Sequence, residues 1–352
     1  MAKLGLIFTT DYEIFGNGTG CVEDCVIKPT EQMAFLLERY GATLTVFFEV
    51  CEYWAFEKEY AAGRLAVDWA GMMRQQAQDL IKRGHDVQLH FHPQWLDYNY
   101  DGQNWNLNYD LWRIGQLPYE DAQFPERGLK NLFAHGKSTL EEILKPVKPD
   151  YRCEVFRAGA WSIQPEKEVL KALKVNGFKI DSTVAPGLYF KDQLSYYDFR
   201  AAPHNSFSYL IEESVNLPAQ NAGLREVPIF TAKVPLWRKL QFIAFRQMRK
   251  VPFNPRGCRG SAEATKNKSK FQKLSEILFS PYTMSTFGDA NVVEQMKYLT
   301  KLALKKARLQ DEEIVPMVWI SHPKTFANEQ ELEKFLSWVN QNQFISFKSI
   351  QA

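Results

Sequence analysis

Short apolar runs alternate with helix-like stretches along most of this chain, and no other feature constrains its fold as strongly. The runs have the length of strands and lie at 4–10, 43–50, 86–91, 153–156, 178–181, 225–230 and 315–321. Helical patterns lie near 30–40, 70–83, 165–175, 290–308 and 328–340. A strand reaches a parallel neighbour only through a crossover connection, which is usually a helix. The alternation therefore predicts an α/β protein with a parallel sheet.

Two stretches interrupt this alternation, near 95–135 and 232–288. The first is rich in Trp, Tyr and Asn, and the second carries a basic run from Arg256 to Lys270. The chain shows no internal repeat and no Pro-, Gly- or Ser-rich linker long enough to separate domains. We therefore expect a single domain over residues 1–352, with both stretches as insertions above the sheet or as lids.

Charge and apolar pattern exclude several classes of partner. The 43 basic and 41 acidic residues nearly cancel, so the chain gives no argument for nucleic acid or an anionic membrane surface. No stretch approaches the ~20 apolar residues that cross a bilayer, and the N-terminal apolar run is too short for a signal peptide. These observations predict a cytoplasmic protein. The 5 scattered cysteines predict reduced thiols. No heptad seam indicates an oligomeric state.

Polar residues stand where the predicted strands end. The set comprises Asp11, Glu13, His90, His92, Arg157, Asp181 and His322. The carboxyl ends of parallel strands open on one face, so we expect these side chains to converge on one rim. A lone His or Asp at a strand end is more often a cap or a core hydrogen-bonding group. Their recurrence at five strand ends in chain order instead indicates a catalytic site.

The residue types suit amide hydrolysis. Imidazole and carboxylate are ligands that zinc prefers, and a bound metal ion lowers the pKa of its water and polarises a carbonyl. A second carboxylate can take a proton from that water, and a histidine can protonate the leaving group. An arginine can orient a carboxylate through a bidentate contact.

Five short motifs resemble, in order, those of the NodB-type polysaccharide deacetylase family. They are Thr9-Thr10-Asp11-Tyr12-Glu13, the stretch 84–93 ending His90-Phe91-His92-Pro93, the stretch 156–161 beginning Phe156-Arg157, Lys179-Ile180-Asp181-Ser182, and Trp319-Ile320-Ser321-His322-Pro323. Each match is short, and their order and placement at strand ends carry the specificity. The resemblance implies an irregular (β/α) barrel of about seven parallel strands. It also implies a metal-assisted hydrolase of C–N bonds that deacetylates an N-acetylated sugar or glycan precursor.

The resemblance also implies a role for each rim residue. Asp11 would be the general base, and His322 would be the general acid that protonates the departing amine. Arg157 would orient Asp11, and Asp181 would tune or orient His322. His90 would be a metal ligand.

Two departures from the family pattern affect the metal ligands. Tyr12 occupies the place of the family's second adjacent Asp, so Glu13 is the predicted ligand. Gln94 occupies the place of the family's second histidine and is a poor metal ligand. His92 could substitute for it, because alternate residues of an extended strand point to the same face. The predicted site is therefore a divalent ion, zinc in the first instance, on Glu13, His90 and His92; the alternative is that His92 only lines the pocket.

Substrate contacts are predicted for Trp161, which follows the arginine motif, and for Gln94. The expected partner is a carbohydrate or another small molecule. One alternative is a hydrolase of a small cyclic amide without the usual metal site, its pocket closed by the two insertions. Another is a carbohydrate-binding relative that has lost catalysis, which the Gln94 departure would favour.

Overall fold

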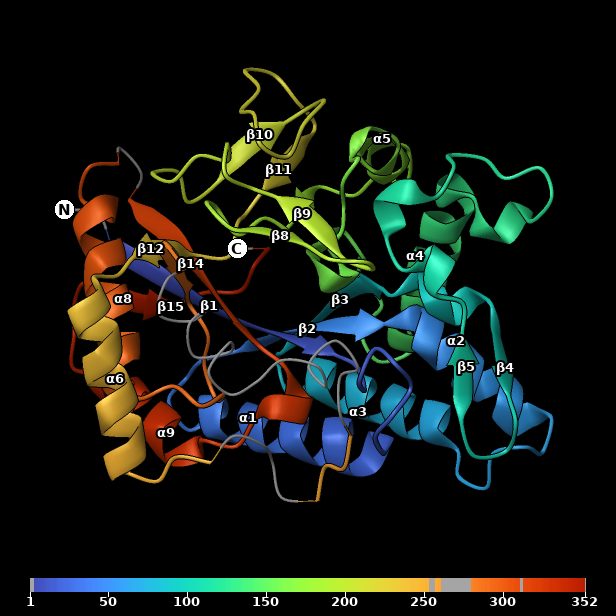
Figure 1. Ribbon diagram of the computed structural model, residues 1–352, viewed down its shortest axis with the longest axis horizontal. Helices are drawn as coiled ribbons and strands as arrows, with labels where there is room; N and C mark the ends of the chain where they lie inside the picture. Colours follow the sequence, from blue (N-terminus) through green and yellow to red (C-terminus); the bar gives the residue numbers. More distant parts are fainter. Residues whose placement is uncertain (1–2, 253–256, 261–279, 311–312, 352) are drawn as a thin grey trace.

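The computed structural model describes residues 3–252, 257–260, 280–310 and 313–351. Its centre is a curled sheet with the strand order β10-β11-β7-β6-β3-β2-β1-β14, and β15 pairs with β1 as well (Figure 1). The strands are β1 (Lys3–Tyr12), β2 (Leu44–Glu49), β3 (Asp86–Phe91), β6 (Val155–Ala158), β7 (Ile180–Asp181), β10 (Tyr209–Ile211), β11 (Leu224–Glu226), β14 (Ile314–Ser321) and β15 (Ile345–Phe347). Only β10 of these nine strands is antiparallel to its neighbour.

This sheet confirms the predicted α/β class with parallel pairing. The sequence predicts about seven parallel strands, one fewer than the sheet contains. The strand missing from the prediction is β15, which follows the last helix. It spans only Ile345–Phe347, too few residues to show the hydrophobic periodicity of a strand. The central strands read as continuous apolar runs because both of their faces are covered. In β1, for example, every residue after Lys3 is buried.

The two ends of the sheet approach each other. Isolated parallel bridges join Ile229, just beyond β11, to Val318, and Thr286 to Ile320. Val318 and Ile320 both lie on β14, the last strand in the order of the sheet. The curl therefore brings the carboxyl ends of the strands around a common rim.

Helices cover the sheet. They are α1 (Lys28–Glu38), α2 (Val50–Ala61), α3 (Trp69–Lys82), α4 (Leu129–Leu144), α5 (Lys167–Val175), α6 (Leu236–Met248), α8 (Val293–Ala307) and α9 (Glu329–Asn340). Helices α2 to α5 contact one another in succession, and α1, α9 and α8 do the same on the other flank. None of the helices in the described ranges is long and apolar enough to cross a membrane.

The two predicted insertions contain small elements of their own. The first holds the hairpin of β4 (Tyr98–Tyr100) and β5 (Trp105–Leu107), several 3₁₀ turns and the start of α4. The second holds β12 (Thr231–Lys233), α6 and β13 (Tyr282–Met284), and most of its basic run lies outside the described residues. Strands β8 (Tyr189–Lys191) and β9 (Tyr196–Asp198) form a further hairpin. The single-domain organisation and the lid role stay predictions.

The prediction of reduced thiols is wrong for two of the cysteines. Cys25 and Cys258 form a disulfide across a sequence separation of 233 residues. Only the folded chain brings the second insertion against the short π-helix Glu23–Ile27 that contains Cys25, so spacing could not reveal the pair. Disulfides persist mainly in oxidising compartments, and this one therefore weighs against the cytoplasmic expectation.

Candidate functional site

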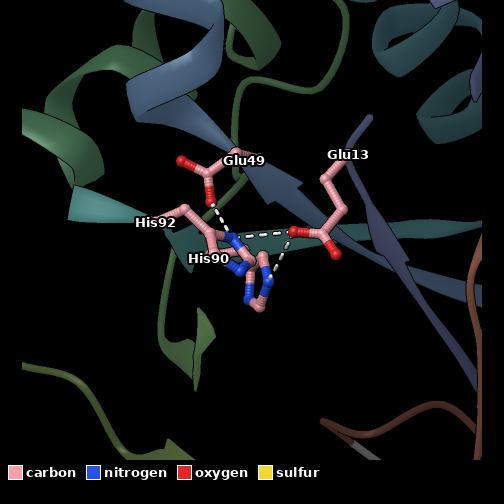
Figure 2. Close-up of side chains that lie close together, drawn as sticks. All are labelled: Glu13, Glu49, His90 and His92. Atoms are coloured by element: carbon pink, nitrogen blue, oxygen red, sulfur yellow. Dashed lines mark hydrogen bonds and ion pairs between the residues drawn. The ribbon is translucent and has the colours of Figure 1, made fainter. Parts of the chain in front are cut away.

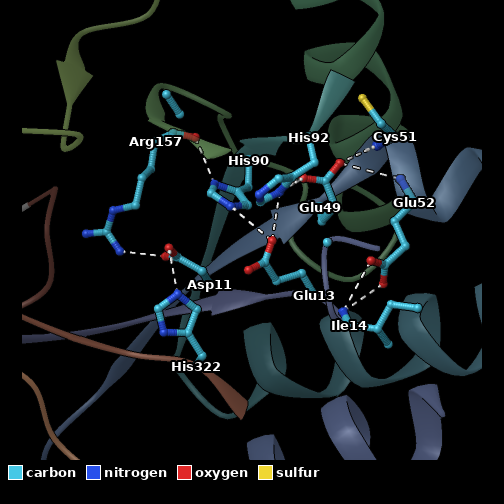
Figure 3. Close-up of polar contacts among 12 residues, drawn as sticks. Asp11, Glu13, Ile14, Glu49, Cys51, Glu52, His90, His92, Arg157 and His322 are labelled. Atoms are coloured by element: carbon cyan, nitrogen blue, oxygen red, sulfur yellow. Dashed lines mark hydrogen bonds and ion pairs between the residues drawn. The ribbon is translucent and has the colours of Figure 1, made fainter. Parts of the chain in front are cut away.

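The register of the sheet places the predicted rim residues within two residues of one level, together with Glu49, which the sequence did not single out. Glu49 on β2 pairs with His90 on β3, and His90 pairs with Arg157 on β6. Asp11 lies one strand further along, beside Phe47. His322 directly follows β14, whose Ser321 pairs with Thr10. The convergence expected from the strand ends is therefore present (Figure 3).

Arg157 is held by several of its neighbours at this rim. Its side chain is fully buried, and Nη1 donates to Asp11 Oδ1 at 2.7 Å and to Thr9 Oγ1 at 2.9 Å. Nε donates to the Ser182 carbonyl at 2.8 Å, and the guanidinium lies 4.0 Å from the Phe47 ring centroid. The guanidinium is thus fixed on several sides, and its contact with Asp11 is the one that the resemblance implied.

Asp11 lies between Arg157 and His322. Its second oxygen is 3.6 Å from His322 Nε2, slightly longer than a hydrogen bond. Burial raises the pKa of Asp11, but Arg157 and the neighbouring histidines outweigh burial and hold this pKa below its usual value. Burial lowers the pKa of His322, although 27% of its side chain is exposed. An ionised carboxylate and a neutral imidazole therefore face each other.

Four buried side chains next to this pair could hold a metal ion. Glu13, Glu49, His90 and His92 each offer a ligand atom, and these atoms lie within 4.8 Å of one another (Figure 2). The two shortest contacts run from His92 Nδ1 to Glu13 Oε2 at 2.7 Å and to Glu49 Oε2 at 3.0 Å. His90 Nε2 lies 3.6 Å from Glu13 Oε2.

His90 fits a metal ligand closely. Its Nδ1 lies 2.8 Å from the Arg157 carbonyl oxygen, which can only accept a hydrogen bond, so Nδ1 carries the proton. Nε2 is then left with a free lone pair, and this buried atom has no hydrogen-bond partner among the described residues. Metal-binding histidines typically donate their other ring N–H to a carbonyl or carboxylate in this way. The donor set thus fits a divalent ion such as zinc.

Two cationic groups already neutralise the negative charge of Glu13. Lys324 Nζ lies 2.5 Å from Glu13 Oε1, and His92 lies against Oε2. Burial alone would raise the pKa of Glu13, but these partners hold it well below its usual value. Burial would likewise lower the pKa of His92, but Glu13 and Glu49 raise it to about 10. A metal ion at this cluster would therefore have to displace a proton from His92.

Sequence reasoning missed Glu49 and Lys324. Glu49 is the last residue of β2, and His90 is the last residue but one of β3, so the strand-end rule that found the other residues also applied to Glu49. Its other oxygen accepts from the backbone N–H of Cys51 at 2.9 Å and caps α2. Lys324 stands two residues after His322, and no motif distinguishes it from other surface lysines.

Asp181 lies on the opposite side of Arg157 from Asp11 and forms a carboxyl pair with Glu226. The two residues are register partners on β7 and β11, and both are fully buried. Asp181 Oδ2 and Glu226 Oε2 lack a donor among the described residues, and a single proton shared between the two carboxyls satisfies both atoms. The other oxygen of Asp181 accepts from Thr183 Oγ1 at 2.6 Å. No contact between Asp181 and His322 is found in the described chain, and the proposed tuning of His322 stays a prediction.

Glu226→Gln is expected to make the protein more stable at alkaline pH. Burial, with Asp181 adding to it, raises the pKa of Glu226 well above its usual value. The folded state then keeps a proton that the unfolded chain releases, so wild-type stability falls as pH rises above about 4.5, by at most about 1.4 kcal/mol per pH unit. Gln mimics the protonated carboxyl and removes this decline.

Urea denaturation from pH 5 to 9 measures this effect. The wild type and Glu226→Gln should be similar at pH 5 and diverge as pH rises, whereas the exposed control Glu213→Gln should follow the wild type throughout. Parallel curves for all three proteins would contradict a shared proton.

The two predicted substrate contacts lie close to this rim. Gln94 is fully buried, and its amide donates to the Gly16 carbonyl at 3.3 Å. Trp161 packs edge-on against Tyr197 at 5.6 Å and, like Ala160 before it, has a positive φ (52° and 48°), a conformation that is rare outside glycine. Contact of either residue with substrate stays a prediction.

A further aromatic residue covers His92. The Trp112 ring lies 6.0 Å from the His92 ring, and its Nε1 donates to Ser195 Oγ at 2.9 Å. On another side the backbone of Gly159 approaches closely, because a Cβ there would lie 2.8 Å from the His92 ring. The first insertion thus reaches the site through Trp112.

Comparison with known proteins gives only distant likenesses. No family model matches the chain, and no curated protein matches it. Among solved structures, 4-α-glucanotransferase from Thermococcus litoralis is 13% identical with a TM-score of 0.49, and the alignment covers 100% of this chain but only 40% of that one. A proposed polysaccharide deacetylase from Mycobacterium smegmatis is 13% identical with a TM-score of 0.47, covering 99% and 88% of the two chains. Puue allantoinase is 10% identical with a TM-score of 0.46, covering 99% and 88%. Likeness at this level assigns neither a family nor an activity.

Proposed function

We propose that this protein hydrolyses a C–N bond, and that its substrate is an N-acetylated sugar or glycan precursor. The observation that carries the proposal is the position of Asp11. It is held by Arg157 on one oxygen and faces His322 on the other, beside a cluster of imidazoles and carboxylates. A base, an acid and a candidate ion site therefore occupy one rim.

The chain's own groups account for the proton transfers. The Asp11 carboxylate takes a proton from water as the water oxygen attacks the carbonyl carbon. His322 receives this proton from Asp11, whose Oδ2 lies 3.6 Å from its Nε2, and gives it to the nitrogen as the C–N bond breaks. Water and amide thus become a carboxylic acid and an amine. Arg157 keeps Asp11 ionised and oriented, and its 0% exposure keeps it from turning towards solvent.

A divalent ion would be held by Glu13, His90 and His92, with Glu49 as a further donor. Such an ion supplies Lewis acidity, polarising the carbonyl and lowering the pKa of water. We propose zinc because imidazole and carboxylate are among its preferred donors.

A second candidate function is hydrolysis of a small cyclic amide without a metal ion. Two observations favour it: Lys324 Nζ lies 2.5 Å from Glu13, and His92 Nδ1 lies between two carboxylates. These contacts already supply positive charge at the cluster. Lys324, rather than an ion, would then stabilise developing negative charge.

Product analysis distinguishes the two substrates. Wild-type protein is incubated with N-acetylated mono- and oligosaccharides and with small cyclic amides, and acetate and new amines are quantified. We expect acetate and amine in equal amounts from an N-acetylated sugar. Turnover of cyclic amides alone would shift the assignment to the second candidate, and turnover of neither class, in protein that is folded and metal-loaded, would contradict the proposal.

His90→Ala is expected to abolish metal binding. His90 presents a buried Nε2 without a partner, and its loss removes one of the neutral donors of the cluster. Elemental analysis of untagged protein after incubation with zinc should give about one equivalent for wild type and little for the variant.

The control is His135→Ala, because His135 is exposed and stacks on Trp54 away from the cluster. It should retain the wild-type metal content. A wild type that takes up no zinc would contradict the metal site and leave the second candidate function.

A further inference from the structure

A groove of the molecule lies apart from the rim. It has a volume of about 500 Å³ and lies between the β12–β13 pair and the last turns of α8. None of the residues discussed above as base, acid or metal ligand lines it. Apolar side chains form part of its lining, among them Leu302 and the exposed Leu309.

One wall of this groove is a stacked aromatic pair. The rings of His204 and Tyr282 are parallel, with an interplanar angle of 1° and centroids 4.7 Å apart. The backbone of Gly187 packs directly against both rings, since a Cβ there would lie 2.5 Å from Tyr282 and 2.6 Å from His204. Gly187 also has a positive φ of 83°, so both its conformation and its missing side chain allow this wall to form.

Three lysines line the same groove: Lys233, Lys305 and Lys306. Lys233 Nζ lies 5.5 Å from the Tyr282 ring, and Lys306 Nζ donates to the His204 carbonyl at 2.9 Å. Throughout the described ranges, no carboxylate forms a salt bridge with any of the three. The groove therefore has a net positive field without an internal anion.

The direction of the His204 pKa shift agrees with the position of the lysines around its ring. Burial lowers its pKa, and the charges of Lys306 and Lys233 lower it further. Two ammonium groups from different elements thus act on one ring, and His204 stays neutral between them.

Helix electrostatics alone does not explain this arrangement. Lysines in the last turn of a helix interact favourably with its carboxyl-terminal dipole, which accounts for Lys305 and Lys306 on α8. Lys233 belongs to β12, outside that helix, and contributes to the same groove. The volume also falls within the range of roughly 300–1,000 Å³ that small-molecule sites occupy.

We propose that this groove binds a nucleoside phosphate, with the base against the Tyr282–His204 wall and the phosphates on Lys233 and Lys306. A flat ring suits the aromatic wall and the apolar part of the lining, and a phosphate supplies the anion that the lysines lack. The proposal does not depend on the hydrolase activity.

Isothermal titration of the full chain with ADP, adenosine and inorganic phosphate tests the proposal. We expect ADP to bind, and each of its two parts to bind at least about tenfold more weakly, because ring and anion are recognised by different walls. The double variant Lys233→Ala/Lys306→Ala should lose about tenfold or more in ADP affinity.

The matched control is Lys297→Ala/Lys301→Ala, which removes two charges from α8 beside Trp338 and outside the groove. It should bind ADP like the wild type, and melting temperatures confirm that both variants are folded. No ADP binding by the wild type, equal losses in both double variants, or phosphate binding as tightly as ADP would each overturn the proposal.

Discussion

Asp11→Asn is expected to lower kcat by roughly 10²- to 10⁴-fold with little change in KM, the range for loss of a general base. Asn has the same shape and can still accept a hydrogen bond from Arg157 Nη1, which lies 2.7 Å from Asp11 Oδ1. It cannot take a proton from water. Steady-state kinetics on the substrate found by product analysis measures the effect, and the metal content should stay at the wild-type level because Asp11 is outside the ion cluster.

The control for this variant is Asp150→Asn, which makes the same change at an exposed position. It should have wild-type kinetics. If Asp11→Asn kept its activity within about tenfold of the wild type, Asp11 would not be the base, because a positioned base contributes at least about a hundredfold.

The rim was predictable from sequence because parallel pairing is a strong constraint. Once the apolar runs are assigned as strands, their carboxyl ends must meet, and polar residues at those ends become neighbours without any knowledge of the register. Asp11, Arg157 and His322 lie at three such ends, and the structure brings them together at this rim. The proximity of these residues was predictable because it follows from a single rule, that the carboxyl ends of parallel strands lie at one edge of the sheet.

Other features depend on register and tertiary packing that the sequence does not reveal. The partnership of Glu226 with Asp181 follows from pairing between β11 and β7, and the sequence segment 225–230 gave no reason to single out that acid. Glu49 was overlooked because the predicted strand, 43–50, runs one residue too far, to the apolar Val50, which in the structure begins the next helix. The Cys25–Cys258 disulfide joins a turn to an insertion, and no local pattern encodes such a contact.

Arg157→Met is expected to destabilise the protein by about 3–5 kcal/mol, the usual result of removing one partner from a buried ion pair. The guanidinium is 0% exposed and forms an ion pair with Asp11, while the Asp181–Glu226 pair lies on the neighbouring strands β7 and β11. Met fills a similar volume but leaves Asp11 ionised without its partner. Urea denaturation at pH 7, followed by two spectroscopic probes, measures the loss.

A double-mutant cycle with Asp11→Asn separates charge from packing. If the loss in Arg157→Met comes from the stranded carboxylate, neutralising Asp11 should recover part of it, and the double variant should be more stable than the sum of the two single losses predicts. Coupling between contacting groups is typically about 0.5–3 kcal/mol. Strict additivity would contradict this account, because it would mean that Asp11 gains no stability from the guanidinium beside it.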